Sequence, residues 1–446
     1  MLRRLAISIA LIAFLSPVVA RTRPHYGGTL RMEMEGDPWQ RPDGLARQLV
    51  LDGLTTVDTD GEVEPALAVE WESENNNHRW RFRLRPGVSF QDGSPLTSVA
   101  VVAGLNAACA ATCPWTTLHA VGASVVFTSD GPMPNLPALL AGDEFRIALT
   151  IASDGSTPRT AIGTGPFQVT SFNNGVLALT AYESCWHGRP FADTIEIRIH
   201  RAVHDQWLDL STGRADVVEV PAADLRTAHQ QRLNVVASPP VDLLALEVAS
   251  SGPLSNANLR ASVALAIDRD ALANVIFQKE GRATGSLLPQ SLTGYGFLFP
   301  VTRDMNKAHE LRSGLNTPAL SMTVDGSGAM QLAAQRIVLN LREAGFNVQI
   351  ASSASPDLIL RKIPITVGEP AAVLERILRN TGSSQPITGD TPSAMYAAEH
   401  DFLDRHTLIP LVNLPRAYAI SGRVRNFALT EAGSQDLANA SVEQAP

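Results

Sequence analysis

The amino-acid sequence predicts an α/β protein of two or three folding units. Its 446 residues exceed the roughly 150 that one domain usually holds. In the second half of the chain, apolar runs at residues 320–324 and 346–350 flank a segment, 334–341, whose apolar residues recur at helical spacing. Gly345 stands where such a helix would end. This β-α-β order predicts parallel strand pairing, because the helix returns the chain to the same end of the sheet.

The composition supports buried cores and excludes several classes of protein. Apolar residues make up 45% of the chain and charged residues 18%, which rules out a largely disordered chain and a collagen-like repeat. Acidic side chains outnumber basic ones by 44 to 36, for a net charge of −8. This balance argues against nucleic acid or an anionic membrane surface as the main partner.

Residues 1–20 have the features of a secretory signal peptide. Arg3 and Arg4 supply a positive end, residues 5–15 form an apolar run, and small residues at 18–20 offer a cleavage point. The apolar run is shorter than the ~20 residues needed to span a bilayer. No cysteine lies near the cleavage point, so a lipoprotein anchor is not expected. We expect a soluble mature chain in the periplasm.

Alternation and turn signals predict a β-rich first half. At residues 79–85, arginines alternate with Trp80, Phe82 and Leu84, which is typical of a half-buried strand. Thr97 has the position of an N-cap for a helix that extends towards Cys109. Residues rich in Gly, Pro and Ser predict loops over 129–164. Further strands are expected at 28–34, 165–171, 176–182 and 194–200.

Helical spacing becomes prominent beyond residue 240. Residues 258–267 predict a helix, and Asp268 has the position of a cap for a second helix through Ile276. Short apolar runs at 357–360 and 409–413 predict further strands.

The three cysteines leave one pairing open. Cys109 and Cys113 are four residues apart, and a regular helix places Cβ atoms at this spacing ~5–6 Å apart, too far for an unstrained bridge. Pro114 takes Cys113 out of helical geometry, so a disulfide that closes the helix end and a pair of buried thiols both remain open. Cys185 is unpaired in either case.

No catalytic signature is present in the sequence. It contains no G-x-S-x-G, H-E-x-x-H, Walker or C-x-x-C motif. His400 and His406 are six residues apart, so a helix would turn them away from each other and a metal pair is not expected. We therefore expect an exported binding protein that is not an enzyme and holds no cofactor or metal.

A set of short motifs follows in a characteristic order along the chain. The most specific is Phe-Arg-Leu-Arg-Pro-Gly-Val at residues 82–88, followed by Phe90 and by Asp-Gly at 92–93. The other motifs lie, in chain order, at residues 27–30, 51–54, 65–68, 95–97, 163–167, 188–190, 213–217, 259–260 and 266–269. Together they resemble the extracellular solute-binding proteins of family 5, the dipeptide-, oligopeptide- and nickel-binding receptors of ABC importers.

This resemblance implies a two-lobed α/β periplasmic-binding-protein fold, type II-like, of the large cluster with an extra subdomain in lobe 1. Lobe 1 would comprise residues 21–238 and would be discontinuous, since residues 411–446 return to it. Lobe 2 would span residues 239–410. Crossovers near Pro240 and Pro410 would join the lobes, and a ligand that contacts both would stabilise the closed form.

The function implied by the resemblance is that of the extracytoplasmic substrate-binding component of an ABC importer. The chain would capture a peptide or peptide-like small solute by lobe closure and deliver it to an ABC permease in the membrane. We expect a monomer. The alternative is a transport-inactive family member that acts as a ligand receptor or scaffold for a membrane partner, which the short chain favours.

One departure from the family concerns the ligand. Many peptide-binding members carry an Asp after the strand that corresponds to residues 357–360, and this Asp answers the peptide's α-amino group. Here the chain continues with Arg361 and Lys362 and no acid follows directly. We hypothesise that the ligand is not a standard peptide and that Arg361 or Lys362 meets an anionic or carboxylate-bearing group. The alternative is that both side chains point to solvent.

Four aromatic residues near expected loops are candidates for the walls of the ligand cleft. They are Trp39, Trp115, Tyr295 and Tyr418. Aromatic walls are common in clefts because they bury a large area at low entropic cost. The alternative for each is packing in a core.

Overall fold

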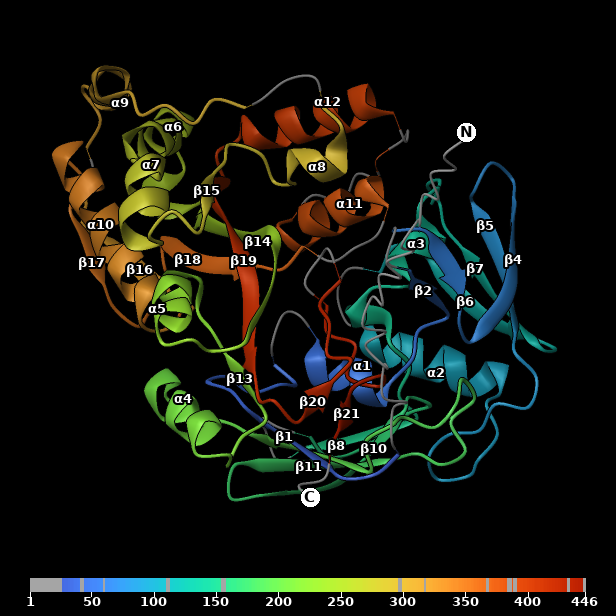
Figure 1. The fold of residues 1–446 in the computed structure, drawn as a ribbon. Coiled ribbons are helices and arrows are strands. Elements are labelled where there is room, and N and C mark those ends of the chain that lie inside the picture. Colours follow the sequence, from blue (N-terminus) through green and yellow to red (C-terminus); the bar gives the residue numbers. More distant parts are fainter. Residues whose placement is uncertain are drawn as a thin grey trace, which may run out of the picture.

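One long sheet runs through the molecule and connects its two halves (Figure 1). The strands in spatial order are β10 (Phe167–Asn173), β11 (Val176–Ala181), β12 (Thr194–Arg198), β1 (Thr29–Glu33), β13 (Val217–Glu219), β19 (Leu408–Ile420), β14 (Val235–Val248), β18 (Leu358–Ile363), β16 (Leu320–Val324) and β17 (Val348–Ile350). The two residues of β15 (Arg282–Ala283) pair with β19.

This computed structural model describes most of the chain after residue 25. The described residues are 26–40, 44–58, 61–109, 113–153, 158–295, 299–316, 318–365, 369–382, 387, 391–430 and 434–443, with the backbone alone at 150–153 and 158–160. The expected signal peptide at residues 1–20 lies outside them. In the described part, no helix is both long and apolar enough to cross a membrane.

The first half of the molecule has cores that draw on residues 30–217 and 418–442. In β1, Leu30 and Met32 alternate into the core, because successive strand residues point to opposite faces. The strand pairs in parallel with β12 and β13. The elements packed around this part of the sheet are α1 (Leu45–Val50), α4 (Val203–Ser211), α5 (Leu225–Gln230), the 3₁₀ turn η2 (Ala222–Asp224), β20 (Val424–Arg425) and β21 (Ser441–Val442).

A separate four-stranded antiparallel sheet forms a subdomain of this half. Its order is β4 (Ala68–Glu74), β5 (Arg79–Leu84), β7 (Ser124–Thr128) and β6 (Thr117–Val121). The predicted alternation in β5 is confirmed, since Trp80, Phe82 and Leu84 are buried. The alternate Arg79 and Arg83 bind glutamates of β4 at 2.6 and 2.5 Å. Around it lie α2 (Ser98–Ala108), α3 (Leu136–Leu139), η1 (Asp143–Phe145) and the hairpin of β2 (Thr55–Val57) with β3 (Val63–Pro65). A second hairpin, β8 (Thr150–Ser153) with β9 (Pro158–Ile162), lies beside β10 of the long sheet.

The second half has cores that draw on residues 222–414. The predicted β-α-β unit is confirmed, because β16 and β17 pair in parallel and α10 (Ala329–Glu343) connects them. One core contains residues of α6 (Ala257–Ala266), the π-helical turn η4 (Leu272–Ile276), α9 (Met305–Arg312) and the 3₁₀ turn η3 (Gly252–Leu254). The other contains residues of α8 (Gln290–Thr293), α11 (Pro370–Asn380) and α12 (Pro392–Leu403).

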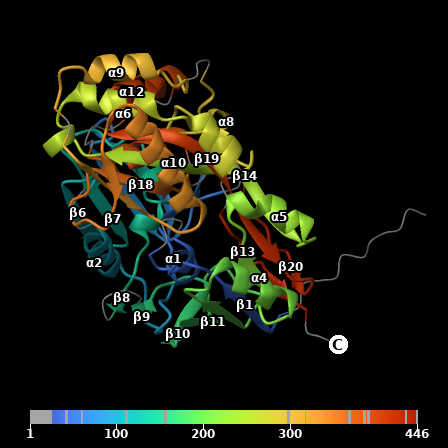
Figure 2. The ribbon, with the colours of Figure 1, turned by 90° about the vertical axis from the view of Figure 1, so that its left-hand side faces the viewer.

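Two long antiparallel strands, β14 and β19, lie at the centre of the long sheet. Figure 2 shows α9 and α12 at one end of the molecule and β8–β11 at the opposite end, with β14 and β19 between them. Their register shifts where Pro240 faces Pro415. Neither proline has a backbone N–H, so the ladder is interrupted there and the strands can bend. The sheet therefore continues between the halves with a weak point near its middle.

A buried carboxylate links three strands beside this interruption. Asp242 of β14 is fully buried, and its Oδ2 lies 3.2 Å from both Nε of Arg416 in β19 and Nζ of Lys362 in β18. Burial alone would raise the pKa of Asp242, but the charges of Arg416 and Lys362 hold it below its ordinary value. The Asp242 carboxylate is therefore ionised, and the positive charges of Arg416 and Lys362 balance its negative charge.

Two predicted caps are confirmed and one expected loop needs correction. Thr97 caps α2 by accepting the N–H of Ala100 at 3.2 Å. Asp268 caps α7 (Arg269–Ala271) by accepting the N–H of Ala271 at 2.9 Å, and the predicted helix continues to Ile276 as the π-helical turn η4. The expected loop at 129–164 contains α3, η1, β8 and β9, because Gly, Pro and Ser also suit tight turns between short elements.

The cysteines differ in state. The Sγ atoms of Cys109 and Cys113 form a disulfide of 2.01 Å with Cα atoms 5.5 Å apart, and Cys109 follows the last residue of α2. Cys185 is a buried free thiol whose pKa burial raises to about 11. A thiol with such a pKa stays protonated and unreactive at neutral pH.

The substitution Asp242→Asn should destabilise the protein by about 3 kcal/mol, because it leaves the buried Arg416 without its charge partner. Urea unfolding followed by circular dichroism measures this change. Glu247→Gln is the matched control, since Glu247 also pairs a β14 carboxylate with a β18 cation, Arg361, but both side chains are about one-third exposed. We expect a loss below about 1 kcal/mol for the control. Equal losses would contradict this interpretation.

Candidate functional site

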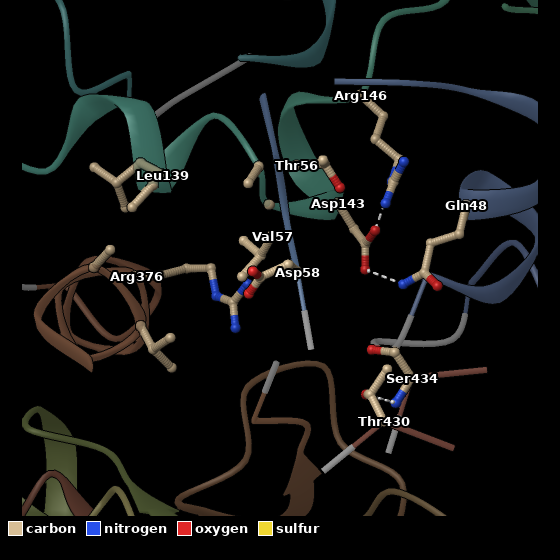
Figure 3. A pocket seen from close by; sticks show the side chains of 15 residues that line it. Gln48, Thr56, Val57, Asp58, Leu139, Asp143, Arg146, Arg376, Thr430 and Ser434 are labelled. Atoms are coloured by element: carbon tan, nitrogen blue, oxygen red, sulfur yellow. Dashed lines mark hydrogen bonds and ion pairs between the residues drawn. The ribbon is translucent and has the colours of Figure 1, made fainter. Parts of the chain in front are cut away.

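A cavity of about 190 Å³ lies between α11 of the second half and the region of α1, β2 and α3 in the first (Figure 3). The residues around it are Gln48, Thr56, Val57, Asp58, Ala138, Leu139, Ala141, Gly142, Asp143, Arg146, Ala372, Val373, Arg376, Thr430 and Ser434. They are far apart in the sequence, so the tertiary fold alone brings them together.

One wall contains a fixed ion pair. Asp143 accepts hydrogen bonds from Nε2 of Gln48 at 3.0 Å and from Nε of Arg146 at 2.7 Å. Arg146 also donates to the carbonyl of Leu51 at 2.9 Å. Gly44 has a φ of +66°, and a Cβ on it would lie 2.4 Å from the Asp143 carboxyl carbon. Both carboxylate oxygens are thus held, and the close approach of Gly44 restricts their movement.

The opposite wall is the helix α11, which sits directly on α3. Ala372 is buried and packs with the hydrophobic core of the first half, although it belongs to the second half in sequence. One turn further, the buried Glu375 accepts a hydrogen bond from Nδ2 of Asn135 at 3.0 Å and pairs with Arg379. The two halves therefore contact each other through one apolar and one polar interaction beside the cavity.

Arg376 is the cation of α11 that points into the cavity. Figure 3 shows its side chain extending towards Val57 and Asp58 on the facing wall. Arg376 as a whole is half-buried, and within the described residues its guanidinium has neither a hydrogen bond nor an ion pair. A partly enclosed guanidinium of this kind favours a carboxylate, which it can bind through two parallel hydrogen bonds.

The rest of the lining is polar or aliphatic. Thr430 and Ser434 close one side, with the Ser434 N–H donating to the Thr430 hydroxyl at 3.1 Å. Among the lining residues that the structure describes, none is aromatic. In the described part of the chain, His, Cys, Asp and Glu form no group of three placed to hold a metal ion. The chemistry available is therefore hydrogen bonding and charge pairing.

A second hollow of about 470 Å³ lies elsewhere on the first half. The described residues that line it are 84–89, 95–98 and 122–123. All belong to the four-stranded subdomain and the start of α2, so a molecule bound there would not contact the second half.

The structure places the two predicted cations on β18, away from the cavity lining. Arg361 pairs with Glu247 at 2.6 Å, and Lys362 pairs with Asp242 at 3.2 Å. Each cation thus has a carboxylate of β14 as its partner. The hypothesis that one of them meets an anionic ligand group stays a prediction.

The four predicted aromatic residues lie in three separate hydrophobic cores. Trp39 and Tyr418 share one core, Trp115 belongs to the subdomain core, and Tyr295 belongs to a core of the second half. All are at most 6% exposed, and none lines the cavity. The structure thus gives all four packing contacts in cores and does not gather them at one site.

Sequence reasoning missed the residues that do line the cavity. The apolar spacing of residues 370–380 marks an amphipathic helix, and Arg376 lies on its polar side with Glu375 and Arg379. The sequence therefore does not distinguish Arg376 from an ordinary arginine on a solvated helix face. Its facing residues at 56–58 are some 300 positions away, and nothing local in the sequence indicates them.

Tyr295 has a notable neighbour in Glu399. The Glu399 carboxylate is fully buried, accepts the N–H of Leu287 on Oε1 and has no hydrogen-bond partner on Oε2. Burial raises its pKa to about 7. Burial and the nearby Glu399 also raise the pKa of Tyr295.

Two α/β halves on a shared sheet, with a polar cavity between them, define the class of two-lobed binding proteins. Residues 62–385 match the family model described as bacterial extracellular solute-binding proteins, family 5. The chain belongs to this family, which consists of solute-binding proteins rather than enzymes. The resemblance and the fold class predicted from the sequence are thus confirmed.

Curated relatives match over part of their length. YhjP of Bacillus subtilis is 30% identical over 249 residues, which are 53% of this chain and 40% of the relative. The probable D,D-dipeptide-binding periplasmic protein DdpA of Escherichia coli is 25% identical over 284 residues, which are 54% of this chain and 52% of the relative. The matched stretch therefore spans about half the length of these relatives or less.

Solved structures share the fold over nearly the whole chain. AgaA of A. tumefaciens R10 in complex with agropinic acid has a TM-score of 0.78 at 17% identity and covers 94% of this chain and 99% of its own. NikA of Staphylococcus aureus in complex with Ni(L-His)2 has a TM-score of 0.77 at 16% identity, with 93% and 100% covered. At these identities the likeness establishes the fold.

The substitution Glu399→Gln should remove a pH-dependent loss of stability. The pKa of Glu399 is about 7 in the folded chain against an ordinary 4.5, so below pH 4.5 both states hold the proton. Between pH 4.5 and 7 the unfolded chain releases it first, and the wild type should lose about 3 kcal/mol relative to the variant. Urea unfolding at pH 4.5 to 8 measures this difference.

Glu310→Gln on α9 provides the control for this series, because the Glu310 side chain is 68% exposed. Its difference from the wild type should not show the same change with pH. A Glu399→Gln difference that is constant from pH 4.5 to 8 would contradict the assignment.

Proposed function

We propose that this chain is the extracytoplasmic substrate-binding component of an ABC importer, which captures a peptide or peptide-like small solute and presents it to a membrane permease. Residues 21–238 with 411–446 form lobe 1 in this proposal, and residues 239–410 form lobe 2. Membership of solute-binding family 5 supports it. Relatives named as periplasmic, among them DdpA, support a location in the periplasm.

The observation that carries the proposal is that both halves contribute to one cavity. Lining residues that lie between Gln48 and Arg146 in the sequence form one side together with Thr430 and Ser434, and Ala372, Val373 and Arg376 of α11 form the other. A solute bound there contacts both sides at once. It stabilises the closed arrangement by the difference between its affinities for the closed and open forms.

The solutes of related structures differ, so the family alone does not name the ligand. One relative, DppA of Helicobacter pylori, is in complex with the peptide STSA, while AgaA holds agropinic acid and NikA holds Ni(L-His)2. The proposal therefore names a small solute of peptide-like polarity as the class of ligand. The residues that line the cavity determine which solute of this class binds.

The substitution Asn135→Ala should weaken ligand binding about tenfold, mainly through faster dissociation. It removes the hydrogen bond to the Glu375 carboxylate that connects the two halves in the closed form. Asn439→Ala is the matched control, because Asn439 donates the same kind of bond to Asp436 within one half, at 2.6 Å. Stopped-flow kinetics with the solute retained by the natively purified protein measures both variants. Equal effects in the two variants would contradict a role in closure.

Native mass spectrometry of the protein from its own periplasm, followed by uptake of the retained solute in cells with and without the permease, tests the transport role. We expect a retained solute and permease-dependent uptake. A retained solute that enters cells equally without the permease would favour a ligand receptor for a membrane partner. A protein that retains nothing and binds no peptide, sugar or metal chelate would overturn the proposal.

A further inference from the structure

The amino end of helix α10 lacks the groups that usually stabilise such an end. The helix starts after Gly328, which provides no side chain to accept a backbone N–H, and its first turn contains no acidic residue. The first backbone N–H groups of a helix have no partner within it and carry a partial positive charge. A negative group from another part of the chain would therefore stabilise this end of the 15-residue helix.

The turn that leads into α10 has a fixed backbone. Gly326 and Gly328 have φ angles of +128° and +52°, which L-residues with a side chain rarely adopt. The Asp325 N–H donates to a carbonyl of β18 at 2.8 Å, and the Ser327 carbonyl accepts the N–H of Met330 at 3.0 Å. Ser327 is therefore held at the positive end of the helix, with its side chain at the surface.

A carboxylate of the first half reaches this turn. Oγ of Ser327 donates a hydrogen bond to Oε1 of Glu35 at 2.5 Å, although the two residues are 292 positions apart in the sequence. Glu35 is the second residue after β1, and its backbone N–H donates to the Glu219 carboxylate at 2.6 Å. The N–H of Met34 donates to the Arg198 carbonyl at 2.9 Å. The Glu35 side chain thus extends from an anchored backbone to a helix end in the other half.

This contact is separate from the cavity. Neither Glu35 nor Ser327 is among the described residues that line it. The hydrogen bond between Asn135 and Glu375 lies beside the cavity, whereas Glu35 and Ser327 meet just beyond the ends of β1 and β16. Because Glu35 and Ser327 belong to different halves, an opening that separates β1 from β16 breaks their hydrogen bond.

We infer that Glu35 favours the closed arrangement of the two halves by capping helix α10, without contact with the solute. The inference rests on the proposed function, in which closure serves capture, and adds to it a contribution from the chain itself. In the closed form the Glu35 carboxylate supplies the missing negative charge at the helix end, and in the open form both groups return to water. Both side chains are exposed, so water competes with the contact and the bias towards closure is modest. A solute then needs a smaller difference in affinity to complete the closure.

Double electron–electron resonance between spin labels on the two halves tests this inference in the solute-free protein. Val99→Cys on α2 and Val275→Cys on η4 provide the label positions, because these side chains are 68% and 71% exposed. The free thiol of Cys185 is buried and should stay unlabelled. Unfolding in guanidinium chloride and refolding removes any retained solute, and native mass spectrometry verifies the removal. We expect a shorter and a longer distance between the labels, from closed and open chains.

Three variants assign the closed population to the contact. Glu35→Ala should lower the ratio of closed to open chains about fivefold, because it removes the charge and the hydrogen bond together. Ser327→Ala should lower the ratio about threefold, since the helix end still attracts the carboxylate. The double variant should lower it about fivefold rather than about fifteenfold, because the second change acts on a contact that is already lost.

Glu64→Ala on β3 is the matched control. It removes an exposed carboxylate from the same half, away from α10, and should leave the ratio unchanged. Far-ultraviolet circular dichroism verifies that each variant folds.

The outcomes separate this inference from the proposed function. Equal distance distributions in the wild type and Glu35→Ala would overturn the inference and leave closure to the solute alone. Single effects that multiply in the double variant would also overturn it, since Glu35 and Ser327 would then act independently. A lowered ratio in Glu35→Ala supports the contact even if the native protein retains no solute and binds no peptide, sugar or metal chelate, in which case the proposed function alone fails.

Discussion

The pairing of β14 with β19 is the constraint on which the rest of the structure depends. These two strands place the sheets of both halves in one continuous ladder, so they set how the walls of the cavity face each other. Pro240 opposite Pro415 removes ladder hydrogen bonds at one point, while Asp242 binds cations of both neighbouring strands next to it. A bend in the ladder and a compensated charge thus occur together, which permits movement without separation of the strands.

Residues on one side of helix α11 make three kinds of contact: apolar packing, a hydrogen bond to the first half and a charged group at the cavity. Glu375 and Arg376 follow Ala372 by three and four residues, and Arg379 follows Arg376 by three, so the four residues lie on one side of the helix. Ala372 packs into the core of the first half and Glu375 bonds Asn135, which brings the helix close to α3. Arg376 is then held at the cavity by neighbours that already have partners.

The sequence predicted those parts of the fold that depend on neighbouring residues. The alternation around Phe82, the cap at Thr97 and the β16-α10-β17 unit are local patterns, and the structure contains each of them. The cavity could not be predicted in this way, because Arg376 meets its facing wall only through the tertiary fold. The sequence also could not decide whether an aromatic residue lies in a core or in a cleft. Trp39, for example, lies in a core, but its sequence surroundings would be the same in a cleft.

The absence of an acid at residues 361–362 of β18 acquires a physical explanation from the charges around these positions. Arg361 and Lys362 stand there, and both are compensated by Glu247 and Asp242 of β14. A carboxylate added at this point would compete for cations that already have partners. Among the described residues, a guanidinium with neither a hydrogen bond nor an ion pair occurs one helix further on, where Arg376 projects from α11. Under the proposed function, a charged group of the solute therefore meets helix α11 rather than β18.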